Sequence, residues 1–153
     1  KRPFELAVAF MRATQADPTP NDGLIWTMST LGHDLFAWQT PDGTPDSLSY
    51  WTGAGGMVGR WNLPVALLWN DGKMAKFPPK WPAPTGGQNA REFVRTMFQR
   101  VCGFPPPDST LAILTLAITK GQPDTMLNPQ EDWNERSRTL CALIAMTPEA
   151  QVR

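Results

Sequence analysis

The chain has 153 residues, and its 14 basic and 14 acidic side chains leave a formal net charge of zero. A hydrophobic fraction of 41% excludes an intrinsically disordered chain, and the neutral balance removes the basic footprint of a nucleic-acid-binding protein. The length predicts one domain over residues 1–153, whose apolar runs are too short or too interrupted to span a bilayer.

Two helices are predicted near the start of the chain. Apolar residues recur there at the helical period: Phe4, Ala7, Val8 and Met11. This pattern predicts a first helix that ends before the turn at residues 17–20. Asn21 or Asp22 caps a second predicted helix, which ends near Trp38. Because the chain enters a helix without an initiator Met or a polar lead-in, we expect it to be a piece of a longer polypeptide.

The middle of the chain alternates turns with weakened helices. Residues 37–47 hold two prolines and an Asp-Gly pair, which predicts an ordered loop. A predicted helix from Ser47 to about Asn62 contains four glycines, each of which costs roughly 1 kcal/mol relative to alanine. We expect Pro64 to interrupt this helix, so that residues 65–69 form a separate short one.

The clearest helical pattern follows a breaker-rich loop. An apolar stripe over residues 93–101 predicts a helix that Gly103 ends. The next segment, residues 111–120, is almost entirely apolar, which predicts a central helix. Asp108 or Ser109 is the expected N-terminal cap of that helix.

The last part of the chain completes the predicted fold class. Asn128 and Pro129 are expected to open a long final helix, and residues 147–149 a short last turn. The sequence therefore predicts an all-α domain of six or seven helices. Long, ordered, Pro/Gly-rich loops join these helices, and we expect no substantial sheet.

The residues that could carry chemistry are few. The single histidine, His33, cannot build a multi-histidine metal site, and we interpret it as a surface or capped residue, so no metal and no cofactor is expected. The spacing of Gly55 and Gly59 is interpreted as allowing two helices to approach closely. Cys102 and Cys141 are either two buried free thiols or one disulfide between helices.

One region has the composition of a carbohydrate site, because sugar rings stack on Trp and hydrogen-bond to Asp and Arg. It consists of the loop 37–51 and the segment after it. The candidate ligand-binding residues are Trp38, Asp42, Tyr50, Trp51, Arg60 and Trp61. The alternative is an enzyme with Asp42 and Asp46 as an acid/base pair. The residues favour a structural interpretation, in which Asp42 is a turn residue, Asp46 is a helix cap and the tryptophans lie in the core.

Short motifs in a fixed order give a family resemblance. They are the start at residues 1–8, Leu31–Phe36 with its Pro-Asp-Gly loop, Trp51 with Gly59–Asn62, and the close at residues 143–151. Together they resemble the C-terminal part of the bacterial family catalogued as domain of unknown function 1800. The resemblance implies a largely helical, exported protein, often encoded beside a secreted partner of the family called domain of unknown function 1501. It implies no established activity and no catalytic residues.

Our functional expectation is a non-catalytic structural or ligand-binding module of an exported bacterial protein, at the cell envelope or outside the cell. The alternative is a hydrolase or other enzyme that acts on an extracellular polysaccharide. The expected partner is the N-terminal part of the same protein or a secreted protein, with carbohydrate as a further candidate. We expect no nucleic acid and no membrane span.

Overall fold

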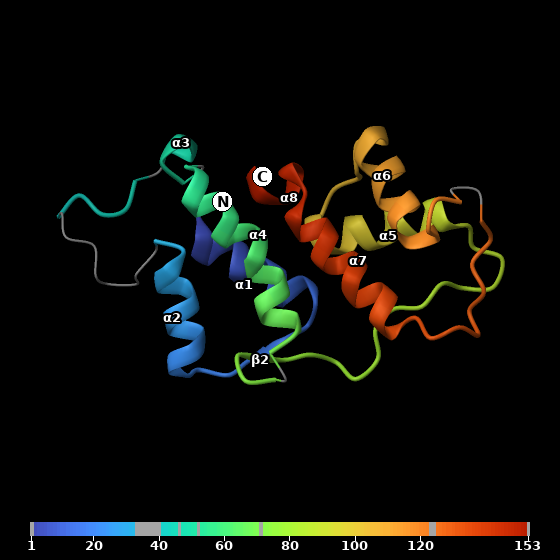
Figure 1. The fold of residues 1–153 in the computed structure, drawn as a ribbon, viewed down its shortest axis with the longest axis horizontal. Coiled ribbons are helices and arrows are strands. Elements are labelled where there is room, and N and C mark those ends of the chain that lie inside the picture. The colour runs from blue at the N-terminus through green and yellow to red at the C-terminus, as the bar shows by residue number, and fades with distance from the viewer. Residues whose placement is uncertain are drawn as a thin grey trace. The chain divides into compact units, whose positions relative to one another are not determined.

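The computed structural model describes residues 2–32, 41–45, 47–51, 53–70, 72–122 and 125–152. Figure 1 shows that they are mostly helical, which confirms the all-α prediction. The helices are α1 (Pro3–Ala13), α2 (Asp22–Thr30), α3 (Leu48–Trp51), α4 (Ala54–Leu68), α5 (Ala90–Cys102), α6 (Asp108–Thr119), α7 (Asn134–Met146) and α8 (Pro148–Val152). The sheet is limited to two antiparallel two-residue strands, β1 (Asp17–Pro18) and β2 (Ala75–Lys76).

The chain divides into two compact units. Unit 1 consists of residues 1–77 and 151–153, and unit 2 consists of residues 78–150. The C-terminal end of α8 therefore belongs to unit 1 although its first residues belong to unit 2. Because the division groups residues by contact, the expectation of a single domain stays a prediction, and each unit is described by itself.

In unit 1, α1 packs against α4. Local signals set the starts of α1 and α2. Pro3 occupies the first position of α1, where its missing N–H costs nothing. Asn21 caps α2, as predicted, because its side-chain oxygen accepts a hydrogen bond from the Leu24 N–H at 2.9 Å. Helix α2 is shorter than expected, however. It ends at Thr30, and Gly32 follows with a φ of +75°, a conformation that glycine adopts without strain.

Helix α4 contradicts the expected break at Pro64. The helix runs continuously from Ala54 to Leu68 with Pro64 inside it, although proline has no N–H to donate to the Arg60 carbonyl. Burial of the side chains on the inward face of α4 stabilises the helix despite Pro64. Leu63 and Leu67 are essentially unexposed there, and burial of such side chains stabilises by about 1.5–3 kcal/mol each.

The two glycines of α4 that were expected to permit close packing differ from each other. A Cβ at Gly59 would lie 2.8 Å from Leu31 Cδ2, whereas a Cβ at Gly55 would meet nothing within 4 Å. Close approach therefore applies to Gly59 and not to Gly55. It places the buried end of α2 directly against α4.

This difference gives a matched pair of substitutions. We expect Gly55→Ala to raise the free energy of unfolding by about 0.5–1 kcal/mol, because alanine favours the helix. We expect Gly59→Ala to gain nothing or to destabilise, because the new methyl group displaces the buried Leu31 side chain. Urea denaturation of both variants measures the difference. Equal stabilisation by the two alanines would contradict the close contact.

In unit 2, α5 packs against α6 and α7, and α6 also contacts α7. Local signals set the limits of α5, and the end at Gly103 was predicted. Asn89 accepts from the Glu92 N–H at 2.8 Å, and Gly103 ends the helix with a φ of +82°. The apolar stripe is buried as expected, and it includes Phe93 and Phe98.

The predicted starts of α6 and α7 were wrong. Asp108 is the first residue of α6 rather than its cap, and Pro107 at the cap position makes no side-chain hydrogen bond. Helix α7 starts at Asn134 instead of Pro129. The Asn128 side-chain oxygen accepts from the Gln130 N–H at 3.0 Å, so Asn128 opens a turn and not a helix.

Helix α6 is also less central than its composition predicted. Leu111, Leu114 and Ile118 are buried on one face. Ile113 is 67% exposed and Leu116 is 42% exposed on the other. An apolar run therefore gives a half-buried helix here, because apolar composition alone does not reveal how many faces the neighbouring helices cover.

The two cysteines are free thiols in the structure, so no disulfide links α5 and α7. Cys141 is buried and Cys102 is half-buried, and the expectation of burial therefore holds fully for one of them. Burial raises the pKa of the Cys141 thiol to about 12, which keeps it protonated at neutral pH. None of the helices in the described part of the chain has the length and apolarity needed to cross a membrane.

Candidate functional site

Part of the predicted site lies outside the described residues. The structure does not describe Trp38 or Asp46, and it does not describe His33. Asp42 is described and exposed. Because Asp46 is outside the described residues, the acid/base pair of Asp42 and Asp46 stays a prediction. No group of three or more metal-binding side chains gathers among the residues that the structure describes.

Arg60 lies in the interior of unit 1, on the inward face of α4. Its side chain is 0% exposed, as is that of Gln151. Arg60 Nε donates to Gln151 Oε1 at 2.9 Å, and a terminal nitrogen donates to the Gln151 carbonyl oxygen at 2.5 Å. The other terminal nitrogen donates to the Trp51 carbonyl oxygen at 3.4 Å. Burial lowers the pKa of Arg60 from its usual value.

Trp51 also lies in the interior of unit 1. Its side chain is 5% exposed, and its indole N–H donates to the Pro45 carbonyl oxygen at 2.7 Å. Tyr50 contacts it edge-on, with the ring centroids 4.9 Å apart. With Arg60, Trp51 therefore ties α3 and the loop before it to α4. Both residues hold the fold of unit 1 in this conformation and offer no surface to a ligand.

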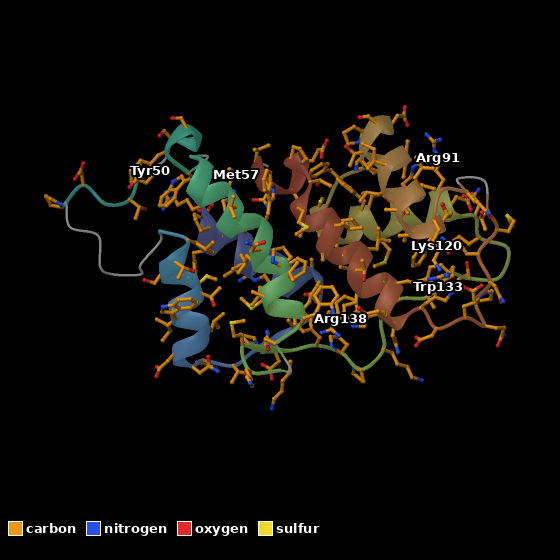
Figure 2. The ribbon with its side chains drawn as sticks, in the orientation of Figure 1. Tyr50, Met57, Arg91, Lys120, Trp133 and Arg138 are labelled. Carbon is orange, nitrogen blue, oxygen red and sulfur yellow. The ribbon has the colours of Figure 1, made fainter. Side chains whose placement is uncertain are left out.

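Of the six predicted ligand-binding residues, three are exposed: Asp42, Tyr50 and Trp61. Tyr50 is 53% exposed on α3, and Figure 2 shows it directed away from α4. Trp61 is 44% exposed and lies on α4. Trp38 lies outside the described residues, and the carbohydrate site stays a prediction.

A different surface is present on the outward face of α4. Four large apolar side chains follow one another at spacings of three, four and four residues, which puts them on one side of the helix. The last of them, Trp69, is the cap residue directly after α4. The four side chains form what we call the α4 stripe: Val58, Trp61, Val65 and Trp69. Their exposed fractions are 53%, 44%, 41% and 39%, respectively.

The α4 stripe has no charged neighbour on its own helix. Arg60 is the only charged residue from Ala54 to Leu68, and it points inward. Helix α4 is therefore apolar on both faces, which is unusual for a surface helix, whose outer face normally carries charge. An uncharged and exposed apolar surface of this kind makes the α4 stripe a candidate interaction surface.

Sequence reasoning found only Trp61 of these four residues. The sequence does contain the pattern of the α4 stripe, because residues 58, 61, 65 and 69 follow the helical period. It was missed because the expected break at Pro64 divided the stripe between two helices. A continuous helix through Pro64 is the condition that puts all four on one face.

The chain is thus an all-α protein whose described residues form two helical units. It belongs to the family described as Protein of unknown function (DUF1800), whose model matches residues 1–152. This membership confirms the resemblance expected from the sequence motifs. No curated protein and no solved structure matches the chain.

Proposed function

We propose that this chain is a non-catalytic interaction module of an exported bacterial protein, and that the α4 stripe docks it onto a protein partner. The observation that carries the proposal is the pair of exposed tryptophans on a helix face without charge. Large aromatic side chains dominate the binding energy of protein interfaces. The stripe spans about 16 Å along α4, at about 1.5 Å per residue.

The chemistry of the stripe favours protein over carbohydrate. A sugar needs hydrogen-bonding side chains beside the aromatic ring, because its hydroxyl groups lose water when it binds. Asn62 is the exposed polar side chain next to the stripe, and the four stripe residues offer only two indole N–H groups. Apolar anchors at positions i, i+3 and i+7 are instead the pattern of a helix that docks into an apolar groove.

The family resemblance indicates a partner. We propose a secreted protein of the family called domain of unknown function 1501, which presents an apolar groove to α4. A stable interface buries about 800 Å² on each protein, so the stripe is the centre of the contact rather than the whole of it. Export of this chain, expected from the resemblance, places the two proteins in the same compartment.

Calorimetric titration with a purified partner of this family tests the proposal. We expect Trp61→Ala to weaken binding at least about 30-fold, because a central aromatic anchor contributes about 2 kcal/mol or more. Trp26 provides the matched control, since it is 68% exposed on α2 and lies outside the stripe. We expect Trp26→Ala to change the affinity by no more than about twofold.

Two results would contradict the proposal. One is equal loss of affinity in the two alanine variants, which would assign the binding to exposed aromatics in general. The other is an absence of binding by the unsubstituted chain. Sedimentation of the chain alone provides a further check, since a dimer that Trp61→Ala dissociates would make a second copy the occupant of the stripe.

A further inference from the structure

Unit 2 contains a pocket that is separate from the α4 stripe. It has a volume of about 180 Å³ and lies where the end of α6 meets the start of α7. Backbone hydrogen bonds hold its wall in place, because the Ala90 N–H donates to the Thr125 oxygen and the Leu127 N–H to the Gln88 oxygen, each at 3.1 Å. The pocket is therefore built on the packed helices of unit 2.

The wall of the pocket combines apolar side chains with polar ones, which include Thr119, Gln122, Thr125 and Asn128. Ile118, Leu127 and Trp133 are among the apolar ones, and each of them exposes less than a tenth of its surface. An apolar cavity of about 150 Å³ is large enough to hold benzene. A volume of about 180 Å³ therefore has room for one aromatic ring or a branched chain of similar size, together with a small polar group.

Among the described residues that line the pocket, two are basic and one is acidic. Lys120 and Arg136 are the basic ones, and Glu131 is the acidic one. Arg136 donates to Glu131 Oε2 at 2.6 Å, and its guanidinium group lies 5.1 Å from the centre of the Trp133 ring. Glu131 thus compensates Arg136. Lys120 makes no ion pair or hydrogen bond through its ammonium group with the described residues.

The backbone of Lys120 supports a role for its side chain. Lys120 ends α6 in the left-handed conformation, with a φ of +54°, where glycine is the residue without strain. Figure 2 shows Lys120 and Trp133 at the same end of unit 2, and both line the pocket. A lysine in this position therefore brings a positive charge to the pocket at a conformational cost that glycine would avoid.

We propose that this pocket binds a small carboxylate with an apolar body of about the size of benzoate. The carboxylate pairs with the Lys120 ammonium group, and the apolar body contacts Ile118 and Leu127. Benzoate is the probe, since its ring matches the volume and its single negative charge is opposite to that of the Lys120 ammonium group. We expect a dissociation constant on the order of 1 mM for a ligand with so few atoms.

An NMR titration with three probes separates charge from shape. Benzoate is expected to shift the indole signal of Trp133, which lines the pocket. Benzamide has the same ring without the charge, and acetate has the charge without the ring. We expect each of these two to bind at least about tenfold more weakly than benzoate. Equal binding of benzamide and benzoate would overturn the proposal, as would an unshifted Trp133 signal.

Substitution of Lys120 tests the charge without endangering the fold. Lys120→Gly relieves the left-handed strain, so we expect an unchanged or higher melting temperature together with at least about tenfold weaker benzoate binding. Lys120→Arg keeps the charge and is expected to stay within about threefold of the original affinity. Lys80→Gly removes an exposed lysine elsewhere in unit 2 and serves as the control.

Unaltered benzoate binding in Lys120→Gly would overturn the proposal. The pocket and the α4 stripe lie in different units, so their tests are independent. Trp61→Ala is expected to leave benzoate binding unchanged, and Lys120→Gly is expected to leave partner binding unchanged.

Discussion

Replacement of Arg60 by methionine is expected to lower the free energy of unfolding of unit 1 by about 3–5 kcal/mol. The methionine retains most of the side-chain volume but donates no hydrogen bond. Gln151 then loses the donors to its side-chain and backbone oxygens, and the Trp51 carbonyl loses another. Because Arg60 and Gln151 are 0% exposed, water cannot easily replace these hydrogen bonds.

Urea denaturation combined with hydrogen exchange of the α4 amides measures this effect in unit 1. Arg91→Met provides the matched control, because the Arg91 side chain is 53% exposed and its ion pair with Asp108 has a separation of 3.4 Å. An exposed ion pair of this kind contributes less than about 1 kcal/mol. A loss below about 1 kcal/mol in Arg60→Met would contradict the structural role of Arg60.

Trp133→Ala is expected to destabilise unit 2 by about 3–5 kcal/mol. Its side chain is 3% exposed, and its ring contacts Phe93 edge-on with the centroids 5.3 Å apart. Its indole N–H donates to the Asn128 carbonyl oxygen at 2.8 Å. The alanine therefore leaves a cavity between α5 and α7 and an unsatisfied carbonyl group.

Trp61→Ala removes the same atoms from a different environment. Trp61 is 44% exposed, and we expect a stability loss of about 1 kcal/mol or less. Thermal denaturation of the two variants under the same conditions measures the contrast. A loss in Trp61→Ala as large as that in Trp133→Ala would show that the α4 stripe supports the fold, and it would remove the stripe as a free docking surface.

The sequence predicted the helices whose limits depend on local chemistry. Helix α5 is the clearest case, because its apolar stripe and the left-handed Gly103 that ends it lie within one segment. Where tertiary contacts determine the limits of a helix, the sequence-based prediction was wrong. Pro64 stays inside α4 because Leu63 and Leu67 are buried on the inward face of the helix, and propensity alone cannot measure that packing.

The candidate site was only partly predictable for a similar reason. Sequence patterns locate tryptophans and arginines but do not tell which side of a helix faces the core. Trp51 and Arg60 were selected as ligand-binding residues, and the structure places both of them in the interior. Trp61, one residue after Arg60, points outward, because consecutive residues on a helix lie about 100° apart.

The pocket of unit 2 gave no signal in the sequence. Lys120 and Trp133 are separated by a segment that was predicted to begin the final helix at Pro129. The true start of α7 at Asn134 leaves a turn instead, and this turn brings Glu131 and Trp133 to the end of α6. An error of five residues in one helix boundary was therefore enough to hide the site.

Assignment of side-chain signals in the complex with the secreted partner tests the central claim most directly. The α4 stripe, as the docking surface, predicts that partner addition shifts the methyl signals of Val58 and Val65 and the indole signals of Trp61 and Trp69. It also predicts that the indole signal of Trp26, which is more exposed than Trp61 or Trp69, does not shift. Shifts at Trp26 with unchanged α4 signals would contradict the claim.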